Sequence, residues 1–354
     1  MTQTAAAGTP ATAFDYELPA HRIAQQPLEQ RDASRLLHLA PDGVISDERF
    51  VDLPRLLRPG DVCVVNDTRV RAARLNGRRD DGGPAELLVL RRLQAGSYLC
   101  LARPSRHLEP GATVCVGGTL RASVTARAAD HPAARIVTFS AAAGDVESAI
   151  AALGSPPVPP YIHEPFDDVE RYQTVYARGP ASSAAAPTAG LHFTPPVIEA
   201  LRQRGIDWTS VRLDVGLATF APIRSADIER HRIHAETFAV SESAAGAIES
   251  ARRRGGRVVA VGTTVVRVLE SCGGGGAALS ACTGSTDLYI RPGHRFHVVD
   301  ALLTNFHQPR SSLLVLLAAF AGTDRWKRAY AHALAHGYRF LSFGDCMLCW
   351  RTQS

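Results

Sequence analysis

Lysine is almost absent from this chain, and long apolar runs are missing. Lys327 is the only lysine, so arginine carries nearly all the positive charge of a chain whose net charge is +5. The longest apolar run covers 313–321, far short of the roughly 20 residues that a membrane span needs. The segment 1–13 lacks the basic start and apolar stretch of a signal peptide. We therefore predict a cytoplasmic protein with no membrane segment and a disordered tail at 1–13.

Cysteine is also sparse, with 7 residues in a chain of 354. An odd number of widely spaced cysteines does not make a disulfide framework and is typical of a reducing compartment. Cys346 and Cys349 have the spacing of a redox or metal pair, but they stand in an apolar stretch without a matching second pair. We predict that both are structural thiols.

The length and the pattern of the chain predict two domains. A chain of 354 residues with 45% hydrophobic and 21% charged residues is typical of a globular protein of about two domains. Between about 69 and 140, short runs rich in Val, Leu and Thr are separated by Gly or Pro turns. This texture predicts a small antiparallel β-barrel.

The remainder alternates strands with helices, which favours an α/β layer architecture. The predicted fold is a mixed α/β domain formed by both chain ends, 14–66 and 155–354, with the barrel domain inserted at 67–154. Within the α/β domain we expect strands at 34–39, 62–65, 208–215 and 257–261 and helices at 195–204, 243–254 and 264–271.

Two neighbouring stretches, "RYQTVYA" at 171–177 and "AAPTAGLHFT" at 185–194, combine aromatic, polar and small residues. Small residues let a backbone approach a ligand, and His192 adds a group that titrates near neutral pH. The stretches could line a pocket that stacks a base, or they could form a long surface loop held by its aromatic side chains. The candidate binding residues are Tyr172, Gln173, Tyr176, Pro187, Thr188, Gly190, His192 and Phe193.

His231, His234 and Glu236 follow a pattern that can bind zinc. Residues three apart share one face of a helix, whereas residues two apart lie on opposite faces, so one regular element cannot present all three. No second acidic or cysteine cluster completes the site. We expect no metal here and keep His234 and Glu236 as candidate residues of a substrate site.

Polar residues also mark several junctions between an apolar strand and a helix. Backbone N–H groups at a helix start suit a carboxylate or a phosphate, although a helix cap explains each junction alone equally well. Several junctions together favour a site, because α/β folds gather ligands at the carboxyl ends of their strands. The candidates are Asp214, Thr219, Phe220, Gly262, Thr263, Thr264, Arg267, Asn305, His307 and Asp345.

Arginines form two clusters, one at 69–79 and one at 252–257. Either cluster could face the phosphates of a nucleic acid, or could be a solvated helix end. The net charge is compatible with a nucleic-acid partner but does not demand one.

The order and spacing of several long motifs resemble those of the S-adenosylmethionine:tRNA ribosyltransferase-isomerases of queuosine biosynthesis. The resemblance runs from Phe14 to the C-terminus and rests on "FDYELP", "IAQQPLEQRDASRLL", "PGDVCVVNDTRVRAARL", "PPYI", "RYQTVYA", "AAPTAGLHFT", "VGTTVVRVLES", "DALLTNFHQPRSSLLVLLAAFAG" and "YRFLSFGD". It implies transfer and isomerisation of the ribosyl group of S-adenosylmethionine onto the 7-aminomethyl-7-deazaguanine at the tRNA wobble position, with release of adenine and methionine. It also implies the two-part fold and no metal, and we expect a monomer.

The implied reaction suggests roles for the candidates. The sulfonium acidifies the C5′ proton, so a base of moderate pKa is needed, and adenine leaves better when a ring nitrogen is protonated. His192 is the first candidate for this acid–base work, followed by His234 and Asp345. Aromatic faces suit the sulfonium, and those available are Tyr172, Tyr176, Phe193 and Phe220. The other expected contacts are the methionine carboxylate or a phosphate at Gly262, Thr263, Thr264 and Arg267, a base at Asn305 and His307, and tRNA phosphates at Arg69, Arg71 and Arg74.

The chain departs from the usual pattern of the family at Asp214, Ala218, His294 and Gln308. Asp214 replaces a usual His and Ala218 a usual Gly, which changes the charge and shape of a predicted pocket wall. These departures keep two alternatives open. One is a relative that modifies a free small molecule with the same S-adenosylmethionine chemistry, and the other is a tRNA-binding protein without catalysis.

Overall fold

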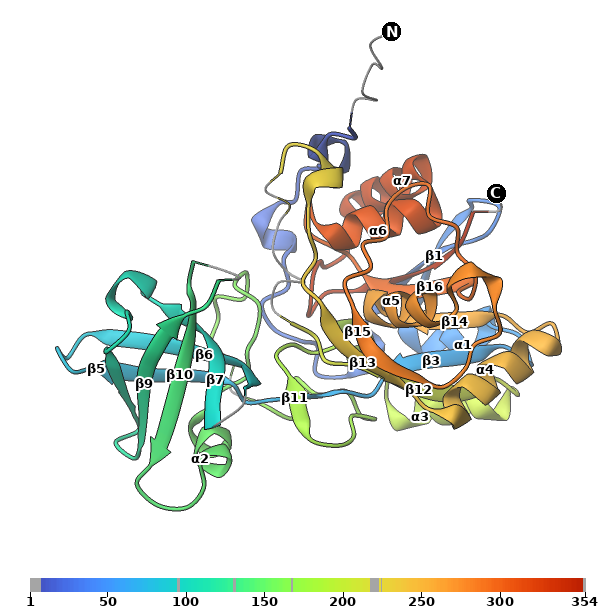
Figure 1. The fold of residues 1–354 in the computed structure, drawn as a ribbon. Coiled ribbons are helices and arrows are strands. Elements are labelled where there is room, and N and C mark those ends of the chain that lie inside the picture. Colours follow the sequence, from blue (N-terminus) through green and yellow to red (C-terminus); the bar gives the residue numbers. More distant parts are fainter. Residues whose placement is uncertain are drawn as a thin grey trace, which may run out of the picture.

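The computed structural model describes residues 8–93, 96–129, 132–166, 168–216, 223 and 225–352. The described chain forms two bodies, a β-barrel and a larger α/β layer structure, which stand side by side (Figure 1). The predicted mixed α/β fold with an antiparallel barrel is confirmed. None of the helices in these ranges is long and apolar enough to cross a membrane.

The α/β body is built on one nine-stranded sheet. Its strands are β1 Arg35–Leu39, β2 Ile45–Arg49, β3 Val62–Asn66, β12 Asp207–Leu213, β13 Glu236–Val240, β14 Val258–Val261, β15 Cys282–Thr286, β16 Ala301–Asn305 and β17 Cys346–Trp350. Their order is β15-β13-β12-β3-β14-β16-β17-β1-β2, and β12, β3, β14 and β16 run parallel. The strands β3, β14 and β16 are buried along their whole length, and their sequences are apolar except for Asn66 at the end of β3 and Thr304 and Asn305 at the end of β16.

Helices cover both faces of this sheet. They are α1 Leu53–Leu56, α3 Pro195–Gln203, α4 Glu242–Arg253, α5 Thr263–Cys272, α6 Ser312–Ala321 and α7 Thr323–Ala335. Successive residues of a strand point to opposite faces, so Val62 and Val64 join the core under α4, α5 and α6, while Cys63 and Val65 join the core under α1 and α3. Both faces of the parallel strands are thereby removed from water.

The barrel is closed by six antiparallel strands. They are β5 Arg74–Arg79, β6 Pro84–Arg92, β7 Ser97–Arg103, β8 Thr113–Val116, β9 Leu120–Arg127 and β10 Ala134–Ala141. Helix α2 (Val146–Leu153) begins after Asp145, whose side chain accepts the N–H of Ser148, and its Ile150 packs into the barrel core. These elements lie within the predicted insert, and the domain boundaries at 66/67 and 154/155 stay a prediction.

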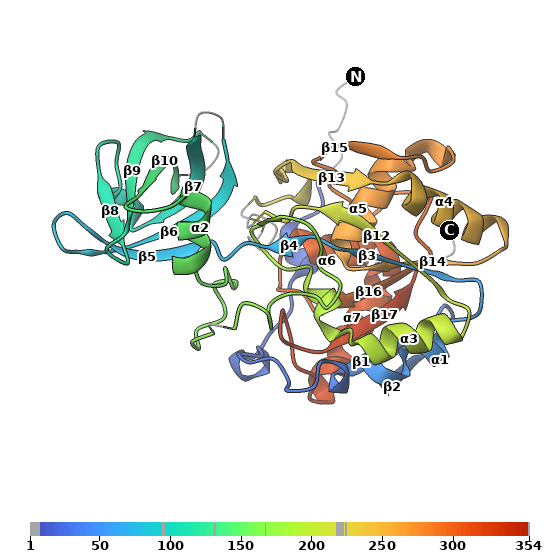
Figure 2. The ribbon, with the colours of Figure 1, turned by 90° about the horizontal axis from the view of Figure 1, so that it is seen from below.

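A small parallel pair, β4 (Arg69–Val70) with β11 (Ala181–Ser183), lies between the two bodies, with β11 labelled in Figure 1 and β4 in Figure 2. The remaining helical segments are short 3-10 turns: η1 Ala11–Phe14, η2 Ala20–Arg22, η3 Arg31–Ala33, η4 Phe50–Asp52, η6 Ser105–His107, η7 Thr188–His192, η9 Ile228–Arg230 and η10 Gly274–Gly276.

Two expectations from the sequence need correction. Residues 8–13 of the predicted disordered tail are packed on the α/β body, where the Ala11 N–H donates to the Ala226 carbonyl at 2.8 Å and Ala11 is buried. The cysteine spacing indicated no disulfide framework, but one disulfide joins Cys272 at the end of α5 to Cys282 at the start of β15. The fold brings the Cα atoms of these two residues to 6.7 Å.

The prediction for the last two cysteines is confirmed. Cys346 and Cys349 are free thiols on β17, and both are fully buried in the sheet. Burial raises the pKa of Cys349 to about 12 and that of Cys346 well above its usual value. A thiol of this kind is a packing group rather than a reactive one.

Candidate active site

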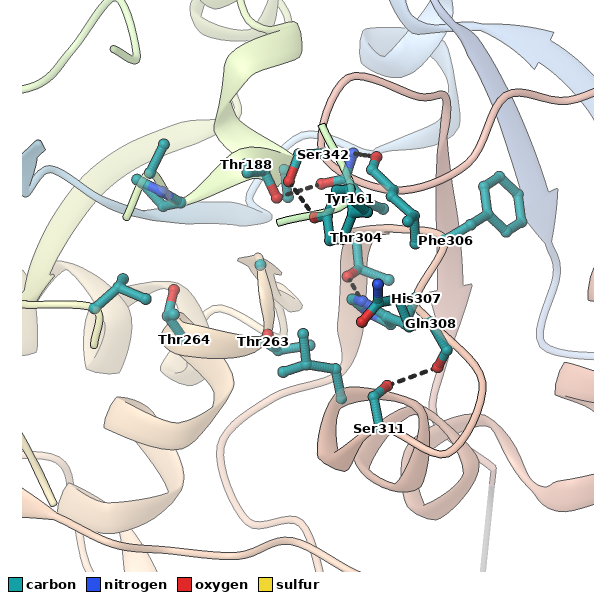
Figure 3. A pocket seen from close by; sticks show the side chains of 18 residues that line it. Tyr161, Thr188, Thr263, Thr264, Thr304, Phe306, His307, Gln308, Ser311 and Ser342 are labelled. Atoms are coloured by element: carbon teal, nitrogen blue, oxygen red, sulfur yellow. Dashed lines mark hydrogen bonds between the residues drawn. The ribbon is translucent and has the colours of Figure 1, made fainter. Parts of the chain in front are cut away.

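A pocket opens where the parallel strands β14 and β16 end and helix α5 begins (Figure 3). Its empty space, counted together with the open solvent at its mouth, is about 620 Å³. The edge at the carboxyl ends of parallel strands is where α/β folds bind ligands. The lining residues are Tyr161, Ala186, Pro187, Thr188, Ala189, Val215, Gly262, Thr263, Thr264, Thr304, Asn305, Phe306, His307, Gln308, Ser311, Leu313, Leu341 and Ser342.

The described lining carries no carboxylate, arginine or lysine. Its two titratable side chains are Tyr161, whose hydroxyl is 2.6 Å from Ser342 Oγ, and His307, whose Nε2 is 2.9 Å from Thr304 Oγ1. Burial raises the pKa of Tyr161 above its usual value and lowers the pKa of His307 to about 3. The lining is therefore uncharged near neutral pH.

One wall of the pocket is the start of helix α5. Gly262 ends the strand β14 with φ +93°, a conformation that favours glycine, and the chain then turns directly into the helix. Thr264 is 6% exposed, and its hydroxyl has no hydrogen-bond partner among the described residues. A helix N-terminus is electropositive and offers N–H groups. This wall suits an anionic group such as a carboxylate.

The opposite wall is held by a chain of polar groups. Asn305 accepts the Thr188 hydroxyl at 2.9 Å, and its amide nitrogen donates to the Leu341 carbonyl at 3.3 Å. Because a carbonyl only accepts, this contact fixes the orientation of the Asn305 amide. The same nitrogen lies 3.2 Å from His192 Nε2, so Nε2 accepts, and Nδ1 donates to Ser34 Oγ at 2.8 Å.

His192 thus lies behind Asn305 and does not line the pocket. Both of its ring nitrogens have protein partners, and its ring stacks on Phe50 with 5.3 Å between centroids. Burial, followed by the charges of Arg171 and Arg31, lowers its pKa to about 3. The expected acid–base role does not fit this placement, because the reaction needs a base of moderate pKa that reaches the substrate.

The two buried imidazoles of His192 and His307 predict a loss of stability in acid. Each has a folded-state pKa of about 3, whereas a histidine in an unfolded chain titrates near about 6.5. The unfolded chain therefore binds these protons first, and the contribution to stability is complete above about pH 6.5 and is lost as the pH falls towards 3. We expect each to lower the free energy of unfolding by about 1.4 kcal/mol per pH unit in that window.

Urea unfolding at several pH values measures this slope. The variant His192→Gln should lose the part of the pH slope that one buried histidine contributes. The variant His163→Gln, at an exposed position, should leave the slope unchanged. An equal slope in His192→Gln and in the unchanged protein would contradict the prediction.

The other two acid–base candidates lie outside this pocket. Asp345 is buried, and its two oxygens accept the N–H groups of Arg35 at 2.9 Å and Arg339 at 2.8 Å. Burial raises its pKa, although both N–H groups oppose this shift. His234 is exposed and lines a separate pocket together with Arg267. The structure therefore does not bring the three predicted catalytic residues together.

The aromatic stretch 171–177 packs behind the pocket rather than lining it. Tyr172 and Phe193 are fully buried, and Tyr176 is 5.4 Å from the Trp208 ring. The side chain of Gln173 bonds the N–H and the carbonyl of Val70, both at 2.9 Å. The expected contacts of these rings with a sulfonium do not fit this placement. The rings pack among other buried side chains instead.

Gly190 belongs to the same packing. A Cβ at this position would lie 2.0 Å from the Tyr176 hydroxyl, so only glycine lets the loop approach that ring. Of the candidate loop residues, Pro187 and Thr188 line the pocket, while Gly190 does not.

The charged candidates Arg267, on helix α5, and Glu236, on strand β13, are paired with each other. Arg267 forms a buried ion pair with Glu236 and also donates to the carbonyls of Leu288 at 3.1 Å and Thr286 at 2.9 Å. Glu236 additionally accepts the Gly216 N–H at 2.6 Å. Arg267 is not among the described residues that line the pocket at the start of α5.

Asp214 accepts the hydroxyls of Thr68 at 2.8 Å and Ser182 at 2.7 Å. It does not line the pocket, although its neighbour Val215 does. The candidates Thr219 and Phe220, and the departure at Ala218, lie outside the described residues.

The candidate tRNA arginines bridge the barrel and its surroundings. Arg69 forms an ion pair with Glu170. Arg71 donates to the Ala181 carbonyl at 3.2 Å and lies 3.6 Å from Glu147. Arg74 donates to Glu86 at 3.1 Å and to the Val158 carbonyl at 2.7 Å. In the second cluster, Arg257 bonds Asp61 with its backbone N–H and with two nitrogens of its guanidinium group.

Sequence reasoning missed several lining residues. Tyr161, Leu341 and Ser342 stand in the motifs "PPYI" and "YRFLSFGD", which carry the resemblance, but only Asp345 of these motifs was chosen as a candidate because it is a carboxylate. Leu341 also has φ +68°, a left-handed conformation that is unusual for leucine. These residues could be recognised as lining residues only from the proximity of the two motifs in the fold, which a single sequence does not show.

A pocket at the carboxyl ends of parallel strands, in a chain that also carries a closed barrel, defines an α/β protein with a candidate site for a small molecule. The model of the family described as "Queuosine biosynthesis protein" matches residues 11–349, and the chain belongs to this family.

Relatives cover nearly the whole chain. The chain is 51% identical over 338 residues to an S-adenosylmethionine:tRNA ribosyltransferase-isomerase of Moorella thermoacetica, covering 95% of this chain and 98% of the relative. It is 49% identical over 344 residues to the enzyme of the same name in Anaeromyxobacter sp. (strain Fw109-5), covering 96% and 98%. A crystal structure of an S-adenosylmethionine tRNA ribosyltransferase from Thermotoga maritima matches with a TM-score of 0.55 and 36% identity, covering 95% of this chain and 99% of that one.

Proposed function

We propose that this protein is a transferase that moves and isomerises the ribosyl group of S-adenosylmethionine onto the 7-aminomethyl-7-deazaguanine base at the wobble position of tRNA. The products are epoxyqueuosine in tRNA, adenine and methionine. The observation that carries the proposal is the 51% identity to a named S-adenosylmethionine:tRNA ribosyltransferase-isomerase across 95% of the chain. No observation favours the alternative of a free small-molecule acceptor.

The pocket at β14, β16 and α5 fits the donor substrate. Its threonine wall at Thr263 and Thr264 suits the methionine carboxylate, because a helix N-terminus stabilises an anion. The Thr188 hydroxyl donates a hydrogen bond to Asn305, so its oxygen can still accept a hydrogen bond from an amino group of the substrate. The described lining holds no carboxylate, so no counter-charge there offsets the pull of the sulfonium on the C5′ proton.

We assign His192 a positioning role in this site. Its imidazole receives a hydrogen bond from the Asn305 amide, and that amide in turn orients the Thr188 hydroxyl. The neutral form is the one that can accept this bond, and burial keeps the ring neutral.

We also propose that Arg69, Arg71 and Arg74 set the barrel against the α/β body. Their partners come from the barrel, from α2 and from the segment after it, so tRNA phosphates would have to displace existing ion pairs. The reaction in this proposal uses no metal, and the cytoplasmic location and monomeric state expected from the sequence stay predictions.

The experiment that tests this function follows adenine and the modified base by mass spectrometry. The protein is incubated with S-adenosylmethionine and with tRNA that carries the aminomethyl-deazaguanine, with the same tRNA carrying guanine, or with the free deazaguanine. We expect adenine release and a modified tRNA only in the first incubation. Release with the free base and none with precursor tRNA would overturn the assignment.

A further inference from the structure

A cluster of metal-ligand side chains lies on the α/β body at a place that the proposed reaction does not use. Asp47 stands on β2, the edge strand of the sheet, while His332 stands on α7 and His336 directly follows that helix. One ligand atom from each side chain lies within 4.8 Å of the other two. None of the three lines the pocket at α5.

The sequence places the two histidines four residues apart on one helical turn, so their side chains share a face. Their rings stack with 3.9 Å between centroids. A histidine pair at this spacing, joined by a carboxylate from another element, is a donor set that first-row transition metals prefer.

Hydrogen bonds already orient two of the three ligands. The Nδ1 of His336 lies 2.8 Å from the His332 carbonyl, which only accepts, so Nδ1 carries the proton and Nε2 keeps its lone pair. One oxygen of Asp47 is held by the Tyr338 hydroxyl and by Arg35 Nη2 at 3.3 Å. Such contacts to the far side of a ligand are the usual support of a metal site.

The other oxygen of Asp47 lies 2.9 Å from His332 Nε2. Two ligands at the tetrahedral angle of one ion, each about 2.1 Å from it, are about 3.4 Å apart, so the two atoms need to separate by only about 0.5 Å to admit a metal ion. A metal ion can therefore replace the proton that lies between these two atoms. That proton moves to Nδ1 of the same imidazole, which stays neutral.

We propose that Asp47, His332 and His336 form a binding site for a divalent first-row transition metal such as Zn²⁺. The ion would tie the edge hairpin of β1 and β2 to helix α7. The positive charge of Arg35, which lies next to the Asp47 carboxylate, opposes the binding of a cation. Its side chain is 37% exposed, so solvent screens the repulsion between the guanidinium group and the metal ion. The site is independent of catalysis, because its ligands lie outside the substrate pocket.

The test uses the full-length protein without a histidine tag, stripped with EDTA. Zn²⁺ binding is measured by calorimetry, and Co²⁺ absorption reports whether nitrogen and oxygen ligands surround the ion. We expect Zn²⁺ to bind at micromolar concentration and to raise the melting temperature. The variant His336→Gln should weaken binding at least about tenfold, since it removes a ligand from an exposed helix end.

The matched control is His163→Gln, which removes an exposed histidine outside the cluster. Cys115, the exposed free thiol, is replaced by serine in all proteins so that it does not bind zinc. Melting curves in EDTA establish that each variant is folded. The proposal is overturned if the unchanged cluster binds no Zn²⁺ at micromolar concentration, or if His336→Gln and His163→Gln bind it equally well.

Discussion

Replacing Arg267 with methionine should lower the free energy of unfolding by about 3–5 kcal/mol. The side chains of Arg267 and Glu236 are 5% and 6% exposed, so solvent hardly screens their pairing. Methionine fills much of the same volume but removes the cation that faces the Glu236 carboxylate. It also removes the donors to the backbone carbonyls of Thr286, at the end of β15, and of Leu288, just after that strand. Urea denaturation measures the loss.

A second ion pair supplies the control. Arg254 and Asp207 also form a close pair, but their side chains are 50% and 47% exposed. Exposed pairs contribute at most about 1 kcal/mol, so Arg254→Met should be nearly neutral. If Arg267→Met were as stable as Arg254→Met but failed to bind S-adenosylmethionine, Arg267 would be a substrate ligand and not a structural residue.

This distinction was invisible in the sequence, although the elements around it were predictable. The apolar run of β14 and the following helix stand within one residue of where the pattern predicted them. The strand-to-helix junction alone was enough to predict that Gly262 and Thr264 belong to the site. Arg267 lies one turn further along the same helix, but its partner Glu236 is 31 residues away in the chain. A local pattern cannot show a contact of that range.

The loop at 185–194 shows the same limit. Its small residues and its histidine predicted a site, and Pro187 and Thr188 do line the pocket. The role of His192 depends on Ser34 and Asn305, which are 158 and 113 residues away in sequence. Those contacts bury the imidazole and change it from a group that titrates near neutral pH into a neutral acceptor.

Replacing Thr264 with valine should raise the KM for S-adenosylmethionine about tenfold or more while the fold stays intact. Valine has the same shape and the same branching at Cβ, so the helix start is preserved. The lost hydroxyl has no partner among the described residues, so its removal costs the folded protein nothing and can stabilise it. Hydrogen bonds to charged groups contribute about 1.5–3 kcal/mol, which corresponds to at least about a tenfold change in affinity.

Thr174 provides a matched comparison for that variant. It is also buried, at 4% exposure, and its hydroxyl also has no partner in the described part of the chain, but it does not line the pocket. Thr174→Val should therefore leave the KM unchanged, and Thr264→Ser, which keeps the hydroxyl, should restore most of the affinity. If Thr264→Val bound the substrate as tightly as Thr174→Val, the start of α5 would not hold the donor. The methionine carboxylate would then have to lie against a different wall of the pocket.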